Sequence, residues 1–237
     1  MKQLVFIHGP GAGACADAYY YQKQYFPGSL IPTLPGHLEG SRCLDIKAYT
    51  EWLRGWLWAH GHNRNLVLVG YTLGASISLQ YALDYPEEVS GLVLMTVAAR
   101  PKTRAPDTYE MRLRAAKDPK VYEDEWIHFQ RKAMYLIDPV LTEKLIDQHR
   151  KVGPMSQYHD LMTIDAFDVR ERISTLKPKL LLLRGMLDHG NPPDYEQEIH
   201  EAVIGSTYIR LEDAGHFPIA EKPEAVNNII ENFVNTL

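Results

Sequence analysis

Short apolar runs alternate with amphipathic segments along this chain. Residues 4–7, 66–69, 92–95 and 180–183 are continuous runs of large apolar residues, as in strands buried on both faces of a parallel sheet. Weaker strand patterns occur at residues 29–31 and 207–211. Helical spacing of apolar residues predicts amphipathic helices over residues 46–60 and 223–234. The alternation predicts an α/β fold with a mostly parallel sheet and helices on both faces.

The most informative stretch runs from residue 65 to residue 81, where a strand passes directly into a helix. Apolar residues recur at helical spacing immediately after the run at 66–69. Gly70 and Gly74 stand on either side of Thr72, and small residues at these positions let the strand and helix backbones approach closely. The pattern predicts a sharp strand–turn–helix with Thr72 at its apex.

Gly70-Tyr71-Thr72-Leu73-Gly74 resembles the G-x-S-x-G nucleophile elbow of α/β-hydrolases, with threonine in place of serine. The resemblance implies that Thr72 is held at positive φ, with its hydroxyl above the sheet. A β-branched residue is strained in that conformation, and its secondary hydroxyl is more crowded than that of serine. We therefore expect attack on a carbonyl to be slower at Thr72 than at a serine.

The loop that follows residues 4–7 resembles the His-Gly loop that forms part of the oxyanion hole in the same family. The resemblance places the first backbone donor at Pro10, which has no N–H. Loss of one such donor costs about 10²- to 10³-fold in rate. The remaining candidates are the N–H groups of Gly11 and of Leu73, the residue after the apex.

The resemblance also assigns an acid and a base. Asp188 follows the run at 180–183, where the family carries its triad acid, and Gly215-His216 matches the loop of the catalytic histidine. The order Thr72, Asp188, His216 is the one expected for this fold. In a hydrolytic reaction His216 would accept the proton of Thr72, while Asp188 would orient the imidazole. His37 and Cys15 are weaker candidates: we expect His37 to pack within its own loop, and Cys15 has no paired base nearby in sequence.

The resemblance divides the chain into a core of residues 1–99 and 177–237 and an inserted helical cap of residues 100–176. Prolines separate the helical segments of this insertion, and it has no buried-strand pattern. Because the first run begins so close to Met1, we expect a short sheet of about six strands. Candidate substrate-binding residues are Tyr71, Trp126, Met134, Tyr158 and Phe217. The insertion begins with a basic group that could attract an anionic substrate or simply be solvated: Arg100, Lys102, Arg104, Arg112 and Arg114.

Composition and charge argue against several classes of partner and cofactor. The 237 residues carry a net charge of −5 with both signs interspersed, which gives no electrostatic reason to expect nucleic acid or anionic membrane as partner. Two cysteines and the absence of a signal-peptide pattern predict a cytoplasmic protein. The histidines show no metal-ligand spacing, so we expect no metal and no cofactor, and a small molecule as substrate. The oligomeric state stays open.

Three interpretations compete. The first is a carboxylesterase-like hydrolase that acts on a small ester, lactone or thioester through Thr72, His216 and Asp188. The second is a lyase or carbon–carbon bond-cleaving enzyme on the same scaffold, with His216 as base and Thr72 as a hydrogen-bond donor. The third is a ligand-binding protein without turnover. Thr72 and Pro10 weigh against the first, and the intact pair of Asp188 and His216 weighs against the third.

Overall fold

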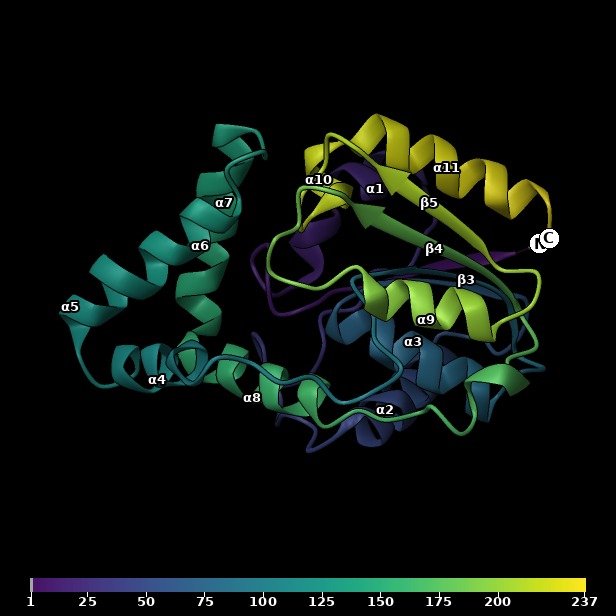
Figure 1. Ribbon diagram of the computed structural model, residues 1–237, viewed down its shortest axis with the longest axis horizontal. Coiled ribbons are helices and arrows are strands. Elements are labelled where there is room, and N and C mark those ends of the chain that lie inside the picture. The colour runs from purple at the N-terminus through teal and green to yellow at the C-terminus, as the bar shows by residue number, and fades with distance from the viewer. Residues whose placement is uncertain (1) are drawn as a thin grey trace.

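Five parallel strands form the centre of the protein in the computed structural model, which describes residues 2–237 (Figure 1). They lie side by side in the order β1-β2-β3-β4-β5, and every neighbouring pair is parallel. All five carboxyl ends therefore meet at one edge of the sheet, where open α/β sheets bind ligands. The strands are β1 Gln3–Ile7, β2 Leu66–Tyr71, β3 Val89–Met95, β4 Lys179–Gly185 and β5 Thr207–Leu211.

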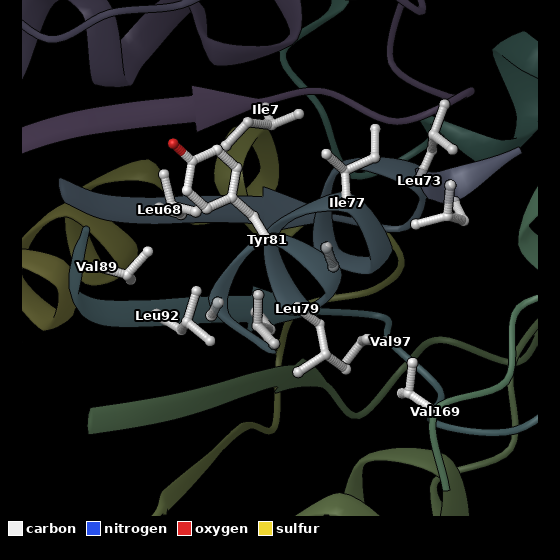
Figure 2. Close-up of a cluster of buried hydrophobic side chains, with 14 of the residues drawn as sticks. Ile7, Leu68, Leu73, Ile77, Leu79, Tyr81, Val89, Leu92, Val97 and Val169 are labelled. Atoms are coloured by element: carbon white, nitrogen blue, oxygen red, sulfur yellow. The ribbon is translucent and has the colours of Figure 1, made fainter. Parts of the chain in front are cut away.

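The strands divide the core into two layers. Successive side chains of a strand point to opposite faces, so Leu92 and Leu94 belong to one buried cluster while Val93 and Met95 belong to the other. Figure 2 shows the first cluster, in which Ile77 and Leu79 of the helix after β2 pack with strand residues. Burial on both faces explains why the strands read as continuous apolar runs.

Helices cover both faces of the sheet, as predicted (Figure 1). Buried residues of α2 Ile46–Ala59, α3 Leu73–Asp84 and α9 Asp194–Ala202 join the first cluster. Helices α1 Tyr20–Tyr25, α10 Pro218–Glu221 and α11 Pro223–Asn235 lie on the other face. Within residues 2–237 no helix has the length and apolar character needed to cross a membrane.

The sheet has one strand fewer than the sequence suggested. Leu30, in the predicted strand at residues 29–31, forms a single parallel bridge with Val5 of β1. Its N–H donates to the carbonyl of Leu4 and its carbonyl accepts from the N–H of Phe6. Pro27 and Pro32 flank this segment and cannot donate to a ladder, so the pairing does not extend.

Residues between β3 and β4 form helices. They are α4 Pro106–Ala115, α5 Pro119–Val121, a π-helical turn Tyr122–Ile127, α6 His128–Ala133, α7 Pro139–Val152 and α8 Pro154–Asp165. Four of the prolines that separate segments in the sequence are the first residues of α4, α5, α7 and α8, where a missing N–H costs nothing. Figure 1 shows this helical layer at one end of the sheet.

Helix α8 is tied to the core by polar contacts. The Ser156 hydroxyl donates to the carbonyl of Gly36, and the His37 ring lies 2.8 Å from the Asp160 carboxylate. Burial opposes protonation of His37, but Asp160 outweighs it and raises the pKa of the imidazole. His37 thus packs within its loop and holds α8, in line with the structural role expected for it.

Candidate functional site

The turn between β2 and α3 has the geometry of a nucleophile elbow. Thr72 has φ 50° and ψ −111°, a conformation that costs a β-branched residue about 1–3 kcal/mol. A Cβ added at Gly70 would lie 2.3 Å from the carbonyl oxygen of Gly74, and one added at Gly74 would lie 1.9 Å from that of Ile7. Glycine is required at both positions because backbone meets backbone there.

The Thr72 hydroxyl faces the loop after β1. Its Oγ1 is buried and has no hydrogen-bond partner within residues 2–237. It occupies the space of a side chain at residue 9, because a Cβ added at Gly9 would lie 1.7 Å from it. The fold brings Thr72 and His216 to the same edge of the sheet, but in this rotamer the hydroxyl is not hydrogen-bonded to the imidazole.

Asp188 and His216 form a close pair. Asp188 follows β4 and His216 follows β5, and Oδ2 of Asp188 lies 2.9 Å from Nδ1 of His216. The carboxylate also accepts from the Gly190 N–H at 2.9 Å. Burial opposes its ionisation, but His216, the Gly190 N–H and Arg184 outweigh burial and lower the pKa of Asp188 to about 2. Asp188 is therefore a carboxylate at neutral pH and holds the Nδ1 side of the imidazole.

Arg184 fixes the loop that carries Asp188. The side chain is buried and pairs with Glu196 of α9 at 3.0 Å. Its Nη2 donates to the backbone carbonyls of Asp188 and Asn191, while the Asn191 amide donates to the Asp188 carboxylate at 3.3 Å. Sequence reasoning missed Arg184 and Asn191, although both lie within a few residues of Asp188.

Glu221 fixes the loop that carries His216. Its carboxylate accepts from the N–H groups of Gly215 and Phe217, the two neighbours of His216. These bonds also satisfy donors that precede α10. Glu221 follows the Gly-His motif by a few residues, and nothing in the sequence distinguished it from a surface glutamate.

Two backbone N–H groups expected to bind an oxyanion have no hydrogen-bond partner among the described residues. Neither the N–H of Gly11 nor that of Leu73, at the start of α3, donates a hydrogen bond to another described residue. The carbonyl of Pro10 accepts from the Gln157 side chain at 3.0 Å, and the Tyr71 hydroxyl donates to the carbonyl of Gly11. The loop around Pro10 is therefore held by its carbonyl groups, which leaves its remaining N–H available.

A cavity of about 390 Å³ lies between the carboxyl edge of the sheet and the helices at 106–165. This volume is within the range of small-molecule sites. Its wall includes five of the predicted catalytic, oxyanion-hole and substrate-binding residues, namely Pro10, Gly11, Asp188, His216 and Phe217. The helical layer contributes Arg104, Thr108, Arg112, Phe129, Gln130, Ala133, Tyr135, Gln157 and Leu161.

Phe217 alone among the five predicted substrate-binding residues is on this wall. Tyr71 and Met134 are fully enclosed in the second core cluster, and Tyr158 packs its ring against Tyr109. Trp126 is fully buried and donates from Nε1 to Gln157 at 2.8 Å. Four of the candidates are therefore not on the wall: Tyr71, Trp126 and Met134 are enclosed in the second core cluster, and Tyr158 is half-buried beside Tyr109.

Gln157 is the polar centre of the helical wall. Its Oε1 accepts from Trp126, from Nε of Arg112 at 2.8 Å and from Nε2 of Gln130 at 2.9 Å. The sequence contained no signal for Gln157 or Gln130, since a lone glutamine in a helix is ordinarily solvated. Arg112 was visible only as one of several basic residues.

A second cavity of about 650 Å³ lies on the other side of the Asp188 loop. It shares six lining residues with the first cavity, among them Asp188 and Arg104. Its wall lacks His216 and the loop of Gly11, so the smaller cavity is the candidate site. Cys15 is buried, which raises the pKa of its thiol to about 11 and disfavours a thiolate nucleophile. No group of three or more His, Cys, Asp or Glu residues in 2–237 is arranged to hold a metal ion.

Comparison with known proteins places this geometry in a family. Among curated proteins, pimeloyl-[acyl-carrier protein] methyl ester esterase of Neisseria meningitidis serogroup B is 24% identical over 248 aligned positions, which cover 99% of this chain and 93% of that protein. Lipase 1 of Psychrobacter immobilis is 26% identical over 246 positions, which cover 98% of this chain and 75% of that protein.

Solved structures have the same fold. A thermophilic esterase from Thermogutta terrifontis, solved with malate bound, has a TM-score of 0.81 at 22% identity and covers 100% of this chain and 90% of that chain. The enol-lactonase from Burkholderia xenovorans has a TM-score of 0.80 at 17% identity, covering 99% and 92%. A model of the alpha/beta hydrolase family matches residues 4–229. With a match over nearly its whole length, this chain belongs to the alpha/beta hydrolase family.

Proposed function

We propose that this protein hydrolyses a small carboxylic ester, lactone or thioester, with Thr72 as nucleophile, His216 as general base and Asp188 as the residue that orients the base. The observation that carries the proposal is the 2.9 Å contact between Asp188 and His216 on the wall of the cavity. A buried carboxylate paired with an imidazole beside a small-molecule cavity is the arrangement that a general base needs.

The relatives support an ester-hydrolysing enzyme. The curated proteins that align with 98–99% of this chain are named as an esterase and a lipase. Ester hydrolysis is common to these names, whereas the acyl and alcohol parts of the substrates differ. The natural substrate of this chain therefore has to be inferred from its own cavity. The cytoplasmic location stays a prediction.

In the proposed reaction the Thr72 hydroxyl attacks the ester carbonyl while His216 accepts its proton. The alcohol then leaves with that proton, and water activated by His216 releases the acyl group as a carboxylic acid. Because Oγ1 faces Gly9 in the structure, the first step is a rotation of Thr72 about χ1 toward His216.

The N–H groups of Gly11 and Leu73 are the proposed oxyanion donors. Both are free of partners within the described residues, and Leu73 is the first residue of α3, where the helix dipole favours negative charge. Pro10 contributes no N–H, so Gly11 takes the position that the family assigns one residue earlier. Residues 100–176 act as the cap that closes the site from above.

A second candidate is a lyase or carbon–carbon bond-cleaving enzyme in which His216 moves protons and Thr72 is not acylated. The placement of Thr72 favours it, because Oγ1 is buried and Thr72 is not on the cavity wall. The two candidates differ in one respect that can be tested. A covalent acyl intermediate forms on Thr72 only in the first.

The test measures hydrolysis of short-chain 4-nitrophenyl esters by the wild type, Thr72→Ser, Thr72→Ala and His216→Ala. We expect Thr72→Ser to raise kcat by about tenfold, equivalent to about 1.4 kcal/mol of relieved strain and crowding. Thr72→Ala and His216→Ala should have no measurable activity. A fluorophosphonate should add its mass to Thr72 in the wild type.

Two results would contradict the proposal. Full activity of Thr72→Ala with loss in His216→Ala would reject Thr72 as nucleophile and leave His216 as the base that activates water for direct attack on the ester. No hydrolysis of any ester, lactone or thioester by either the wild type or Thr72→Ser would remove hydrolysis altogether. A folded His216→Ala protein, checked by circular dichroism, is the control for both.

A further inference from the structure

The basic residues at the start of the helical layer differ in whether an acid neutralises them. Arg100 pairs with Asp194 and Glu198, and Arg104 pairs with Asp165 at 2.7 Å. The exposed Arg114 pairs with Glu125. Lys102 donates to the Asn191 side chain at 3.3 Å. Carboxylates therefore neutralise Arg100, Arg104 and Arg114, but not Lys102 or Arg112. Of these last two residues, only Arg112 is on the wall of the candidate site.

Arg112 is a buried cation without a counter-ion. Only 3% of the residue is exposed, and no carboxylate in residues 2–237 lies within ion-pair distance of it. Its Nε donates to Gln157 and its Nη1 to the carbonyl of Thr108, both neutral acceptors. Burial, reinforced by Arg104, lowers its pKa to about 10, so the guanidinium is still charged at neutral pH. Buried charges in proteins are ordinarily paired, and an unpaired one is costly.

The cavity connects this cation with the proposed catalytic residues. Arg112 is part of the helical wall, whereas His216 and Gly11 belong to the sheet edge, and all three line the same space of about 390 Å³. Phe129, whose ring centroid is 5.6 Å from the Arg112 guanidinium carbon, and Leu161 supply apolar surface on the same wall. A ligand in this cavity meets a positive charge, an apolar wall and the imidazole.

We propose that the substrate carries a carboxylate, which binds Arg112 while the scissile ester lies at His216. The inference rests on the proposed ester hydrolysis and names the substrate class of that same site. The planar guanidinium fork matches a carboxylate, and Arg104 is already neutralised by Asp165. The single unpaired charge of Arg112 is balanced by the one negative charge of a carboxylate. A phosphate dianion would carry one negative charge too many. The substrate is thus a half-ester of a short dicarboxylic acid or a similar anionic ester.

Arg112 also has a structural role, because it supports Gln157, and the experiment must separate the two. A purely structural arginine would affect neutral and anionic substrates alike. The substrates are therefore 4-nitrophenyl half-esters of succinate, glutarate and adipate, each compared with its methyl-capped neutral diester. The variants are Arg112→Met, Arg112→Lys and, as a matched control two residues along α4, the exposed Arg114→Met.

We expect the wild type to prefer at least one half-ester over its neutral diester in kcat/KM. Arg112→Met should lower that preference by about 10- to 100-fold, the usual effect of one hydrogen-bonded charge. Arg112→Lys should retain part of the preference and Arg114→Met all of it. Equal losses for neutral and anionic esters in Arg112→Met, or a wild type without preference at any of the three lengths, would overturn the inference.

A binding measurement separates failure of the inference from failure of the proposed function. Succinate, glutarate and adipate are titrated by calorimetry into the wild type and Arg112→Met, with glutaramide as the neutral control. Binding of a dicarboxylate that is lost in Arg112→Met, without hydrolysis of any ester, would keep the carboxylate site and reject hydrolysis. Ester hydrolysis with no dicarboxylate binding and no anionic preference would keep the proposed function and reject the carboxylate site.

Discussion

Gln157 of α8 donates a hydrogen bond of 3.0 Å to the carbonyl of Pro10, and so links the helical layer to the loop after β1. In a trans peptide the C=O and the following N–H point in opposite directions. The bond to Pro10 therefore also orients the N–H of Gly11, directing it away from Gln157. One side chain thus connects the cavity wall, the Arg112 guanidinium and the proposed oxyanion donor.

Replacement of Gln157 by leucine should destabilise the protein and reduce activity. The change removes the acceptor of the buried Trp126 N–H and of the Arg112 guanidinium, and each lost buried partner costs about 1–3 kcal/mol. Urea unfolding measures the free energy, and kcat on a neutral 4-nitrophenyl ester measures the function. The exposed Gln24, changed to leucine, is the control and should shift stability by no more than about 0.5 kcal/mol. Equal stability of the two variants would refute the role of Gln157.

Replacement of Gly9 by alanine should abolish activity through Thr72. The new Cβ would lie 1.7 Å from Thr72 Oγ1 and 2.8 Å from the Tyr71 carbonyl oxygen, so the elbow must shift. We expect a loss of at least about 100-fold in kcat, since a displacement of about 1 Å has that effect. The control is Gly55→Ala in the middle of α2, where a Cβ meets nothing within 4 Å.

Gly55→Ala should raise stability by about 0.5–1 kcal/mol without changing kcat, because alanine costs less conformational entropy in a helix. Thermal unfolding of both glycine variants measures the contrast. Normal kcat in Gly9→Ala would show that the elbow accommodates the added Cβ without moving the Tyr71 carbonyl, and would contradict the predicted shift of the elbow.

Asp188→Asn should lower kcat by about 10³- to 10⁴-fold while the protein remains folded. An amide at this position donates rather than accepts, and so stabilises the wrong tautomer of His216. The side chains of residues 188 and 216, 2.9 Å apart in the wild type, would stay in contact, but the amide nitrogen would now be the donor. Steady-state kinetics on the ester that the wild type hydrolyses best provides the measurement. A variant within about tenfold of wild type would exclude Asp188 from orienting the base.

The Asp188 pKa also predicts a pH dependence of stability. The pKa of the Asp188 carboxyl is lowered from 3.8 to about 2 in the folded state. The ionised carboxylate therefore stabilises the fold above pH 4, and this contribution is lost as the pH falls from about 4 to about 2. At about 1.4 kcal/mol per pKa unit the loss amounts to about 2 kcal/mol. Unfolding of wild type and Asp188→Asn at pH 5, 3 and 2 isolates it. The stability difference between them should shrink toward low pH, and a constant difference would contradict the assignment.

The sequence by itself determined the scaffold. Buried parallel strands read as apolar runs wherever they stand, and Gly70 and Gly74 mark the elbow because backbone contacts exclude any side chain there. The order of Thr72, Asp188 and His216 followed from their positions after three strands. These features are local, so the sequence alone carries them. The sixth strand predicted at residues 29–31 was wrong, because Leu30 lies between two prolines and forms only a single bridge.

Only the tertiary structure decided which side chains face the cavity. Trp126 and Met134 fill the layer behind the wall, whereas Arg112 and Gln157, from different helices, meet on it. The sequence also could not predict that the Thr72 hydroxyl lies against Gly9. Side-chain directions in an inserted helical layer depend on how separate helices pack against one another and on the core, and residue spacing within one helix does not contain that information.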